Sequence, residues 1–411
     1  MNTTQKSWVI VVGVDSPIGV SILRDLGKHG HPSIGIGYSA EAIGFQSKFC
    51  TRSLVRSNQE STFIEQLNGL VEDAEPLFLI AISESDISLL NRHRDALHPA
   101  IKLLIPTADI FARVVDKSRC LEIARDLGIE TPASLSITRL EQLKNLKQIL
   151  SFPLILKWAD PNEVQERLSL RGLAVIKCDY CLDYETLYAK LSRYQPLGIF
   201  PMIQTYCRGY GLGQMFLMSR GEVLLEFQHQ RLNEWPPEGG ISTLCRSLPL
   251  TQHRQCRNRS IALLRALEWE GVAMVEYRFD PVADSYSFME INGRFWGSLP
   301  LAEAAGVSFP STLVAAAAGD LESVAARQRP YAELSCRYMI PDTKRLLRIV
   351  LGRKNIKDPH FSPRPFKEIS KYLGGFFNIN QRYYLFSRTD LGPCIKDLKN
   401  VFLKLRACFI K

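Results

Sequence analysis

Residues 289–298 of this 411-residue chain read MEINGRFWGS and place an acid, an amide and a guanidinium at alternate positions. In an extended strand, Glu290, Asn292 and, if the strand persists, Arg294 point to one face while Ile291 points to the core. Such a polar set is costly to bury without partners. Carboxylate and amide oxygens suit Mg²⁺, and a guanidinium suits phosphoryl or carboxylate oxygens. The segment therefore predicts Glu290 and Asn292 as metal ligands and Arg294 as a candidate catalytic residue.

A second acid lies on the strand predicted just before this segment, at residues 272–280. A turn at 280–284 leads into a strand at 285–291, and the resulting hairpin lets Glu276 face the same metal position as Glu290. Paired carboxylates are common where Mg²⁺ bridges nucleotide phosphates. For Glu276 alone, a solvated hairpin face held by ion pairs is the favoured alternative. The four residues together predict a magnesium and phosphate site.

Two lysines lie where a phosphate would explain them. Lys157 ends the apolar run FPLILK, and burying an ammonium is expensive unless an anion lies beside it. Lys117 begins a helix predicted over residues 116–128, where the helix dipole disfavours a cation. A bound phosphate would reverse that preference, and the alternative is an exposed lysine.

Residues 228–243, QHQRLNEWPPEGGIST, are predicted to be a strand that leads into a loop rich in proline and glycine. Arg231, Glu234 and the turn at 239–242 could bind a substrate carboxylate through a guanidinium and backbone N–H groups. Arg231 is therefore a second candidate catalytic residue. The alternative is an ordinary ordered loop.

The elements that would position these residues alternate between strand and helix over the first 115 residues. Apolar runs at 7–14, 33–37, 77–83 and 103–106 predict buried parallel strands of an α/β domain. The loop at 13–19 lacks the GxGxxG spacing, so a tight strand-to-helix turn is favoured over a dinucleotide site. Strands at 154–158 and 174–177 and a helix at 183–193 follow.

Residues 201–291 are predicted to be rich in strands, at 201–206, 214–219, 223–230, 272–280 and 285–291, with one helix at 251–267. Residues 298–318 are rich in alanine and are predicted to be helical. Residues 343–351 and 395–406 have the pattern of basic amphipathic helices.

Composition indicates a globular protein of two to four domains. No apolar run reaches the roughly 18 residues of a membrane span, and no signal peptide is evident, so we expect a cytoplasmic protein. The close pair Cys178 and Cys181 is a weak zinc signal, and reduced cysteines are the favoured interpretation. The net charge of +9 is concentrated at the end of the chain, where residues 331–411 hold 17 Lys and Arg against 6 Asp and Glu.

This basic segment could contact an anionic surface, either a membrane or a nucleic acid, through its helices and aromatic residues. Packing of the aromatic residues against the body, as a lid or a dimer element, is the favoured alternative. The aromatic residues are Phe376, Phe377, Tyr383, Tyr384 and Phe386. No specific nucleic acid binding is expected, and a homodimer is left open.

Several motifs, in their order along the chain, resemble those of the ATP-grasp ligases. They are Asp116-Lys117 with LGIETP at 127–132, the strand FPLILK at 152–157, the segment QTYCRG at 204–209, and EINGRFWGS followed by an Ala-rich helix. The resemblance spans residues 8–320. It implies a mixed α/β and α+β fold, with a Rossmann-like pre-ATP-grasp domain at 1–115 and a small lobe at 116–200. A large lobe with the Mg-ATP site would follow at 201–325, and a basic helical extension at 326–411.

The resemblance also implies roles for particular residues. Lys157 and Lys117 would contact the phosphates of ATP, and Glu276, Glu290 and Asn292 would hold Mg²⁺, or Mn²⁺ in its place. The segment Gln204, Thr205, Tyr206 and Cys207 would form the adenine hinge, mostly through backbone groups. Three features depart from the family: no glycine precedes Gly172 in the expected phosphate loop, Trp158 replaces a proline, and Gly211 or its neighbours replace a ribose-binding carboxylate.

The function that follows is an ATP-dependent ligase, which activates a carboxylate as an acyl phosphate and joins it to an amine. Such chemistry needs neutralisation of charge around the transferred phosphoryl group and no protein nucleophile. The alternative is a protein of the same fold that binds nucleotide without catalysis, which the missing glycine-rich loop would favour.

Overall fold

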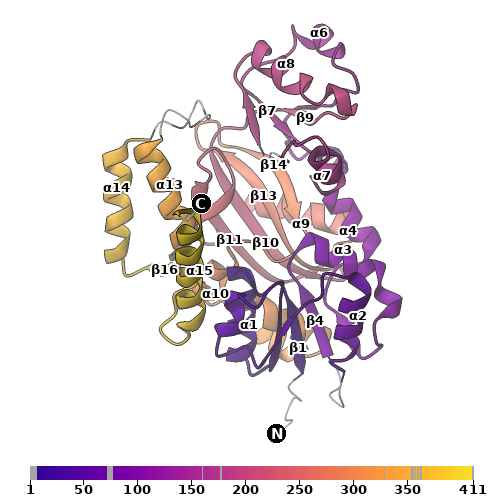
Figure 1. The fold of residues 1–411 in the computed structure, drawn as a ribbon, viewed down its shortest axis with the longest axis vertical. Helices are drawn as coiled ribbons and strands as arrows, with labels where there is room; N and C mark the ends of the chain where they lie inside the picture. Colours follow the sequence, from indigo (N-terminus) through magenta and orange to yellow (C-terminus); the bar gives the residue numbers. More distant parts are fainter. Residues whose placement is uncertain are drawn as a thin grey trace.

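Three β-sheets make up the fold in the computed structural model (Figure 1). The structure describes residues 7–71, 77–159, 161–175, 178–327, 329–352 and 363–409, together with residues 356, 358 and 361. In Figure 1 the N-terminal sheet lies at the bottom, a long central sheet occupies the middle, and a small sheet lies at the top. The alternation of α/β and β-rich segments predicted from the sequence is confirmed, and the domain boundaries stay predictions.

The N-terminal sheet has five parallel strands in the order β3-β2-β1-β4-β5. The strands are β1 (Trp8–Val12), β2 (Ser33–Gly37), β3 (Arg52–Val55), β4 (Leu77–Ala81) and β5 (Ile101–Leu103). The helices are α1 (Pro17–Lys28), α2 (Glu60–Asn68), α3 (Glu84–Arg92) and α4 (Ala108–Val115), with short 3₁₀ turns η1 (Ile43–Gln46) and η2 (Arg94–Ala96). Strand β3 escaped prediction because its residues are mostly exposed. The strand order reverses between β1 and β4, which opens a crevice at their carboxyl ends.

The small sheet has the strand order β6-β9-β7-β8. Its strands are β6 (Ser134–Leu135), β7 (Leu154–Lys157), β8 (Asp179–Cys181) and β9 (Met202–Thr205), and its helices are α5 (Lys117–Asp126), α6 (Gln142–Leu146), α7 (Pro161–Ser169) and α8 (Tyr184–Ser192), with the 3₁₀ turn η3 (Gln195–Leu197). The strand predicted at 174–177 is wrong for Ala174 and Val175, and its other two residues lie outside the described part of the chain.

Helix α7 occupies the place where the phosphate loop was expected. Trp158 is buried against Leu168 and Tyr194, and its ring meets that of Tyr194 edge to face at 5.2 Å. Trp158 is therefore the core of a small cluster against which α7 packs.

The central sheet has seven strands in the order β14-β13-β10-β11-β12-β15-β16. Its strands are β10 (Tyr210–Ser219), β11 (Glu222–Trp235), β12 (Ile241–Ser247), β13 (Gly271–Asp280), β14 (Ser285–Asn292), β15 (Ser335–Arg337) and β16 (Gln381–Tyr383). The associated helices are α9 (Arg254–Ala266), α10 (Leu299–Ala305), α11 (Phe309–Ala317) and α12 (Leu321–Arg327). The prediction that residues 298–318 are helical is confirmed, with a break at Gly306, whose φ of +93° ends α10.

Strand β13 shows how one face of this sheet changes character along its length. Its inward residues, Ala273, Val275, Tyr277 and Phe279, all belong to the core on the α9 side. On the opposite face, Val272 and Met274 pack into the core formed with α10 and α11. The later residues on that same face, beginning with Glu276, are polar. The period-two pattern that builds the sheet therefore also delivers charged side chains to one end of it.

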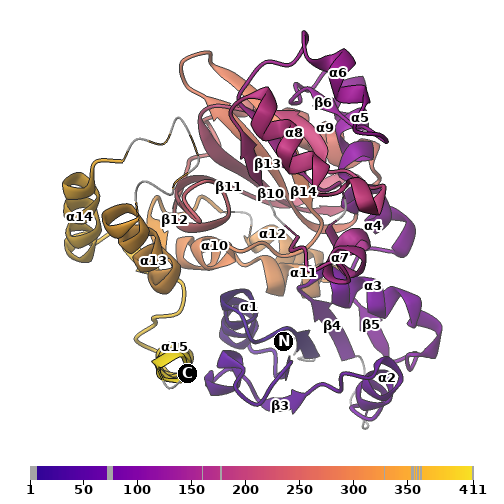
Figure 2. The same ribbon diagram turned by 45° about the horizontal axis from the view of Figure 1, so that its top comes forward.

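The C-terminal segment folds back onto the rest of the chain. It contains α13 (Met339–Leu351), α14 (Pro365–Gly374), the 3₁₀ turn η5 (Gly375–Phe377) and α15 (Gly392–Phe409). Figures 1 and 2 both place α13 beside β11 and β12, with α14 on the outer side of α13. The aromatic residues divide between two environments, since Tyr384 is buried whereas Phe377 is 86% exposed. The prediction that they pack against the body is therefore wrong for Phe377.

A buried ion pair fixes the end of the chain against its beginning. Arg24 Nε in α1 lies 2.9 Å from Asp390 Oδ2, and both side chains are almost fully buried. Asp390 also accepts hydrogen bonds from the Ser47 hydroxyl and the Lys48 backbone N–H, at 2.8 and 2.9 Å. The start of α15 thus docks on the N-terminal sheet through a satisfied polar network.

None of the helices in the described part of the chain is long and apolar enough to cross a membrane alone. The consecutive helices α10 and α11 together have the length and apolar composition of a membrane-spanning helix, but a bend of 88° separates them.

Removal of the carboxylate in the Asp390→Ala variant should destabilise the fold by about 3–5 kcal/mol, because it leaves the Arg24 guanidinium buried and unpaired. The measurement is urea unfolding followed by circular dichroism. The exposed Glu65→Ala substitution on α2 is the control and should change stability by less than about 0.5 kcal/mol. Equal midpoints for the two variants would contradict the buried clamp.

Candidate active site

Two carboxylates face one another at the polar end of the central sheet. In the antiparallel register of β13 and β14, Glu276 lies opposite Glu290, and Met274 lies opposite Asn292. A bulge at Met289 shifts the phase of β14, so that Phe288 and Ile291, three residues apart, are both buried. Without the bulge, Glu290 and Phe288 would share a face. The predicted hairpin and its acidic pair are therefore present.

Lys117 reaches this pair from the first turn of α5. Its Nζ lies 3.1 Å from Glu290 Oε2. Asp116 caps the helix by accepting hydrogen bonds from the backbone N–H groups of Ser118 and Arg119. Burial alone would lower the pKa of Lys117, but the carboxylates of Glu290, Glu84 and Glu276 outweigh burial and raise the pKa. The lysine is therefore firmly protonated beside the acidic pair.

Arg231 reaches the pair from the other side, across strand β10. Its guanidinium donates to Glu276 and lies 3.9 Å from Glu234. The arginine can cross because Gly211 of β10 has no Cβ: a Cβ there would lie 2.7 Å from Arg231 Cδ. Strand β11 runs to Trp235, so the prediction that Glu234 lies in a loop is wrong, and so is the predicted end of the strand at residue 230.

A second arginine, Arg278, extends the charged surface along β13. Its Nη2 lies 3.5 Å from Glu234 Oε2, and the carboxylates of Glu234 and Glu276 raise its pKa against the opposing effect of burial. The period-two alternation of β13 puts Arg278 on the same face as Glu276. Carboxylates and guanidinium groups therefore alternate across the polar end of the central sheet.

Lys157 enters from the small sheet, at the end of β7. No carboxylate among the described residues forms an ion pair with its ammonium. Burial lowers the pKa of Lys157, and the charges of Glu290 and Cys178 only partly oppose that effect. Of the cations in the site, Lys157 is the one whose burial a bound anion would offset most clearly.

The predicted hinge follows β9 and approaches Lys157. Gln204 is buried and donates to the Ser134 hydroxyl at 3.1 Å, while its Oε1 has no hydrogen-bond partner among the described residues. The Thr205 and Tyr206 backbone N–H groups donate to Ala133 and Pro153 carbonyl oxygens. Burial raises the pKa of the Cys207 thiol, and Ser287 and Lys157 partly offset the effect.

Arg294 lies beyond the end of β14, so the strand does not persist far enough for Arg294 to share its face with Glu290 and Asn292. Gly293 separates Arg294 from the strand. Glycine is required at this position because the Trp269 ring packs where a Cβ would be. Arg294 nevertheless points to the same region, where its Nη2 lies 3.2 Å from Glu84 Oε1. Glu84 begins α3 of the N-terminal part, and nothing in its local sequence distinguishes it.

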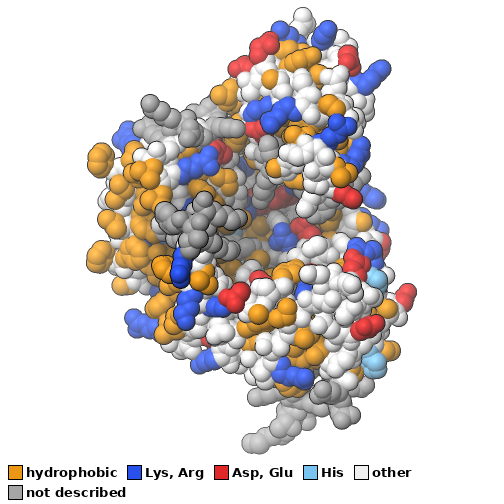
Figure 3. Space-filling view, in the orientation of Figure 1, with side chains coloured by type: hydrophobic (Ala, Val, Ile, Leu, Met, Phe, Trp, Pro, Cys, Tyr) orange, Lys and Arg blue, Asp and Glu red, His pale blue; other side chains and the backbone are white. Residues whose placement is uncertain are grey.

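Two adjoining cavities flank the acidic pair, and neither Lys157 nor the segment from Gln204 to Cys207 lines either of them. The larger, of 510 Å³, lies between the carboxyl ends of β1 and β4 and the central sheet, and Arg231 and Glu276 line it. The smaller, of 320 Å³, lies beside the small sheet, and Lys117 and Trp158 line it. Both cavities share the side chains of Glu84, Glu290, Asn292 and Arg294. Figure 3 shows this face of the molecule hollowed between the upper and lower parts.

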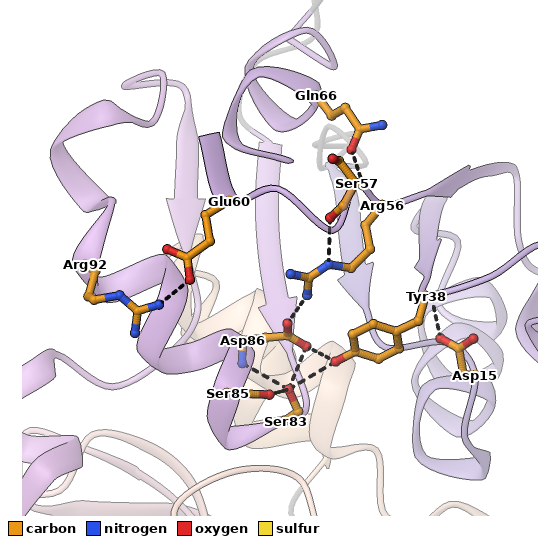
Figure 4. A network of polar contacts seen from close by, with 10 residues as sticks. All are labelled: Asp15, Tyr38, Arg56, Ser57, Glu60, Gln66, Ser83, Ser85, Asp86 and Arg92. Atoms are coloured by element: carbon orange, nitrogen blue, oxygen red, sulfur yellow. Dashed lines mark hydrogen bonds and ion pairs between the residues drawn. The ribbon is translucent and has the colours of Figure 1, made fainter. Parts of the chain in front are cut away.

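The N-terminal wall of the larger cavity is held by a polar network (Figure 4) that sequence reasoning missed. Asp86 is buried and binds Arg56, the Tyr38 hydroxyl and the Ser83 hydroxyl. Burial and the hydrogen bond to Asp86 raise the pKa of Tyr38 to about 12. Asp15 accepts from the Tyr38 backbone N–H at 2.9 Å, and burial raises its pKa. The residues come from four strand ends, so only the assembled sheet reveals them.

The donor set fits magnesium shared with phosphate. Among the described residues, no three His, Cys, Asp or Glu side chains form a metal site by themselves. Mg²⁺ is usually held by one or two carboxylates, with waters and substrate phosphates as the other ligands. The opposed Glu276 and Glu290, with the Asn292 amide beside them, match that smaller requirement.

The three-sheet fold is similar to that of several ATP-dependent ligases and carboxylases of known structure. Residues 245–321 match the family described as the carbamoyl-phosphate synthase L chain, ATP binding domain. The matched residues include Glu276, Glu290, Asn292 and Arg294.

Solved structures with the same fold have low sequence identity to the chain. N5-carboxyaminoimidazole ribonucleotide synthetase from Thermus thermophilus is 14% identical, with a TM-score of 0.58 over 80% of this chain and 82% of that one. The L-amino acid ligase from Bacillus licheniformis is also 14% identical, with a TM-score of 0.55 over 76% and 74%.

The biotin carboxylase domain of Hydrogenobacter thermophilus 2-oxoglutarate carboxylase, solved with MgADP, ADP and bicarbonate, is 14% identical. Its TM-score is 0.58 over 77% of this chain and 70% of that one. Urea amidolyase of Saccharomyces cerevisiae is 22% identical over 230 residues, which are 52% of this chain. The chain spans only 12% of that curated relative's length.

The lowered pKa of Lys157 predicts a pH dependence of nucleotide affinity. A phosphate beside Lys157 favours the protonated ammonium, so MgADP affinity should fall as the pH rises through the lowered pKa of the ligand-free protein. Calorimetric titration over a range of alkaline pH measures this. In the Lys157→Arg variant the guanidinium stays charged, so the alkaline loss should shrink. The same decline in both proteins would assign the titration to another group.

Proposed function

We propose that the protein is an ATP-dependent carboxylate–amine ligase that forms an amide through an acyl phosphate. The observation that supports this most directly is the charge arrangement of the cleft. The acidic pair of Glu276 and Glu290 lies among cations from three different elements, and Lys157 has no carboxylate partner in the described part of the chain. Phosphoryl transfer needs this combination of metal ligands and phosphate-binding cations.

In the proposed reaction, a substrate carboxylate takes the terminal phosphoryl group of ATP and releases ADP. An amine then displaces phosphate from the acyl phosphate, forms the amide and loses a proton. Bound Mg²⁺ would supply neutralisation of phosphate charge, with Glu276, Glu290 and Asn292 as its ligands. Lys157 and Lys117 would hold the phosphates, and the segment from Gln204 to Cys207 would bind adenine.

The larger cavity offers places for both organic substrates. Arg231 and Arg294 line it and suit a carboxylate. Asp15 and Glu84 line the wall opposite the central sheet and suit an ammonium or amine. The N-terminal network of Tyr38, Ser83 and Asp86 would keep that wall rigid. The proposal therefore places the carboxylate at the sheet and the amine on the N-terminal side.

One observation favours a second candidate, a nucleotide-binding protein without transfer activity. Helix α7 occupies the position at which the glycine-rich phosphate loop was expected, and its seat on Trp158 fixes it in place. A protein of this kind would bind MgADP without consuming ATP.

A screen of ADP release over amino acids and small carboxylates, with mass detection of products, distinguishes the two candidates. The ligase should release ADP only when a carboxylate and an amine are both present, and should yield a product lighter than their sum by one water. Nucleotide binding without ADP release under every substrate pair would leave the binding protein as the answer.

Glu290→Gln and Lys157→Ala should each lower turnover by at least about 100-fold, because each removes a charge that would act on the phosphoryl group. Circular dichroism should show both variants folded. Glu222→Gln and Lys102→Ala, at exposed positions, are the matched controls and should keep wild-type turnover. Full activity in either cleft variant would refute its assigned role.

A further inference from the structure

Exposed apolar side chains concentrate at the C-terminal end of the chain. Of the 24 large hydrophobic residues that are exposed in the described structure, 14 lie between Leu347 and Leu403. Single exposed apolar residues are ordinary, but a concentration of them marks a surface that is covered in use. Figure 3 shows hydrophobic side chains gathered at the left, over the position of α13 and α14 in Figure 1.

Helix α15 has an apolar stripe that is exposed to solvent. Ile395, Leu398 and Phe402 share one face of the helix, Leu391 just before the helix continues their spacing, and all four are exposed. The opposite face carries the contacts with the body. There Lys396 pairs with Glu41, and Asn400 donates to the Glu41 carbonyl oxygen at 3.0 Å.

The orientation of α15 is fixed at its beginning. Gly392 lies so close to the Gln46 carbonyl that an added Cβ would be 1.9 Å from the oxygen. The buried pair of Arg24 and Asp390 precedes it directly. The helix therefore cannot roll to bury its apolar stripe without breaking these contacts.

Helix α14 and the turn η5 repeat the arrangement. Phe366, Leu373 and Phe377 share one helical face, and the two phenylalanines are 88% and 86% exposed. Lys367 follows Phe366 on α14 and Lys399 follows Leu398 on α15, and both lysines are exposed too. Apolar rings bordered by lysines are typical of helices that lie in the interface of a bilayer.

We propose that the apolar stripes of α14 and α15 bind the surface of an anionic lipid bilayer, with the rings below the headgroups and the lysines among them. Charge favours this partner, because residues 331–411 hold 17 Lys and Arg against 6 Asp and Glu. A second copy of the chain would bring like charges together. The aliphatic stripe of α15 would find no complementary surface on a nucleic acid.

The test is flotation of the full-length protein with vesicles of phosphatidylcholine alone or mixed with phosphatidylserine. Wild type should float with the mixed vesicles only, and added salt should weaken the binding. Leu398→Ser with Phe402→Ser should reduce partitioning about 100-fold, through loss of apolar burial. Lys367→Ala with Lys399→Ala should reduce it about 30-fold.

Ile149→Ser with Val282→Ser changes apolar residues elsewhere that are at least as exposed, and this variant should float as wild type does. All variants should keep the wild-type thermal unfolding and the wild-type affinity for MgADP, since the substituted positions are exposed and outside the cleft. The proposal is overturned if wild type ignores both vesicles or binds them equally. It also fails if Leu398→Ser with Phe402→Ser only converts a dimer to a monomer in sedimentation.

Discussion

The cleft is organised by the need to hold two like charges directly opposite one another on adjacent strands. Glu276 and Glu290 would destabilise the hairpin if nothing opposed their repulsion. Lys117 and Arg231 oppose it from α5 and β11, which reach the pair from different sides. The bulge in β14 and the missing Cβ of Gly211 are the local devices that let these contacts form. Much of the cleft geometry follows from this electrostatic requirement.

The resting ion pairs and the proposed chemistry use the same groups. Lys117 and Arg231 neutralise the acidic pair in the ligand-free protein, and the proposal assigns them to phosphate and carboxylate. Lys157 differs because burial lowers its pKa and no carboxylate compensates for it among the described residues. Two of the three cations, Lys117 and Arg231, are therefore already paired with carboxylates, whereas Lys157 is not. A bound polyanion would offset the unfavourable burial of the Lys157 ammonium.

Local pattern predicted the parts of the site that lie within single elements. The alternation expected for β13 and β14 places Glu276, Glu290 and Asn292 on one face, and the strand register agrees. The same pattern could not place Glu84 or Asp86, because their roles arise only when α3 meets the central sheet and the strand ends. The condition attached to Arg294, that the strand persists, is not met because β14 ends at Asn292.

The clamp between Arg24 and Asp390 joins residues that are 366 positions apart. During synthesis Arg24 leaves the ribosome long before its partner exists, so the N-terminal sheet must first form around a solvated guanidinium. Closing so long a loop carries an entropic cost that other contacts must already have met. The last helix therefore docks after the rest of the chain has folded. Any truncation before Asp390 would leave the Arg24 guanidinium of α1 buried without its partner.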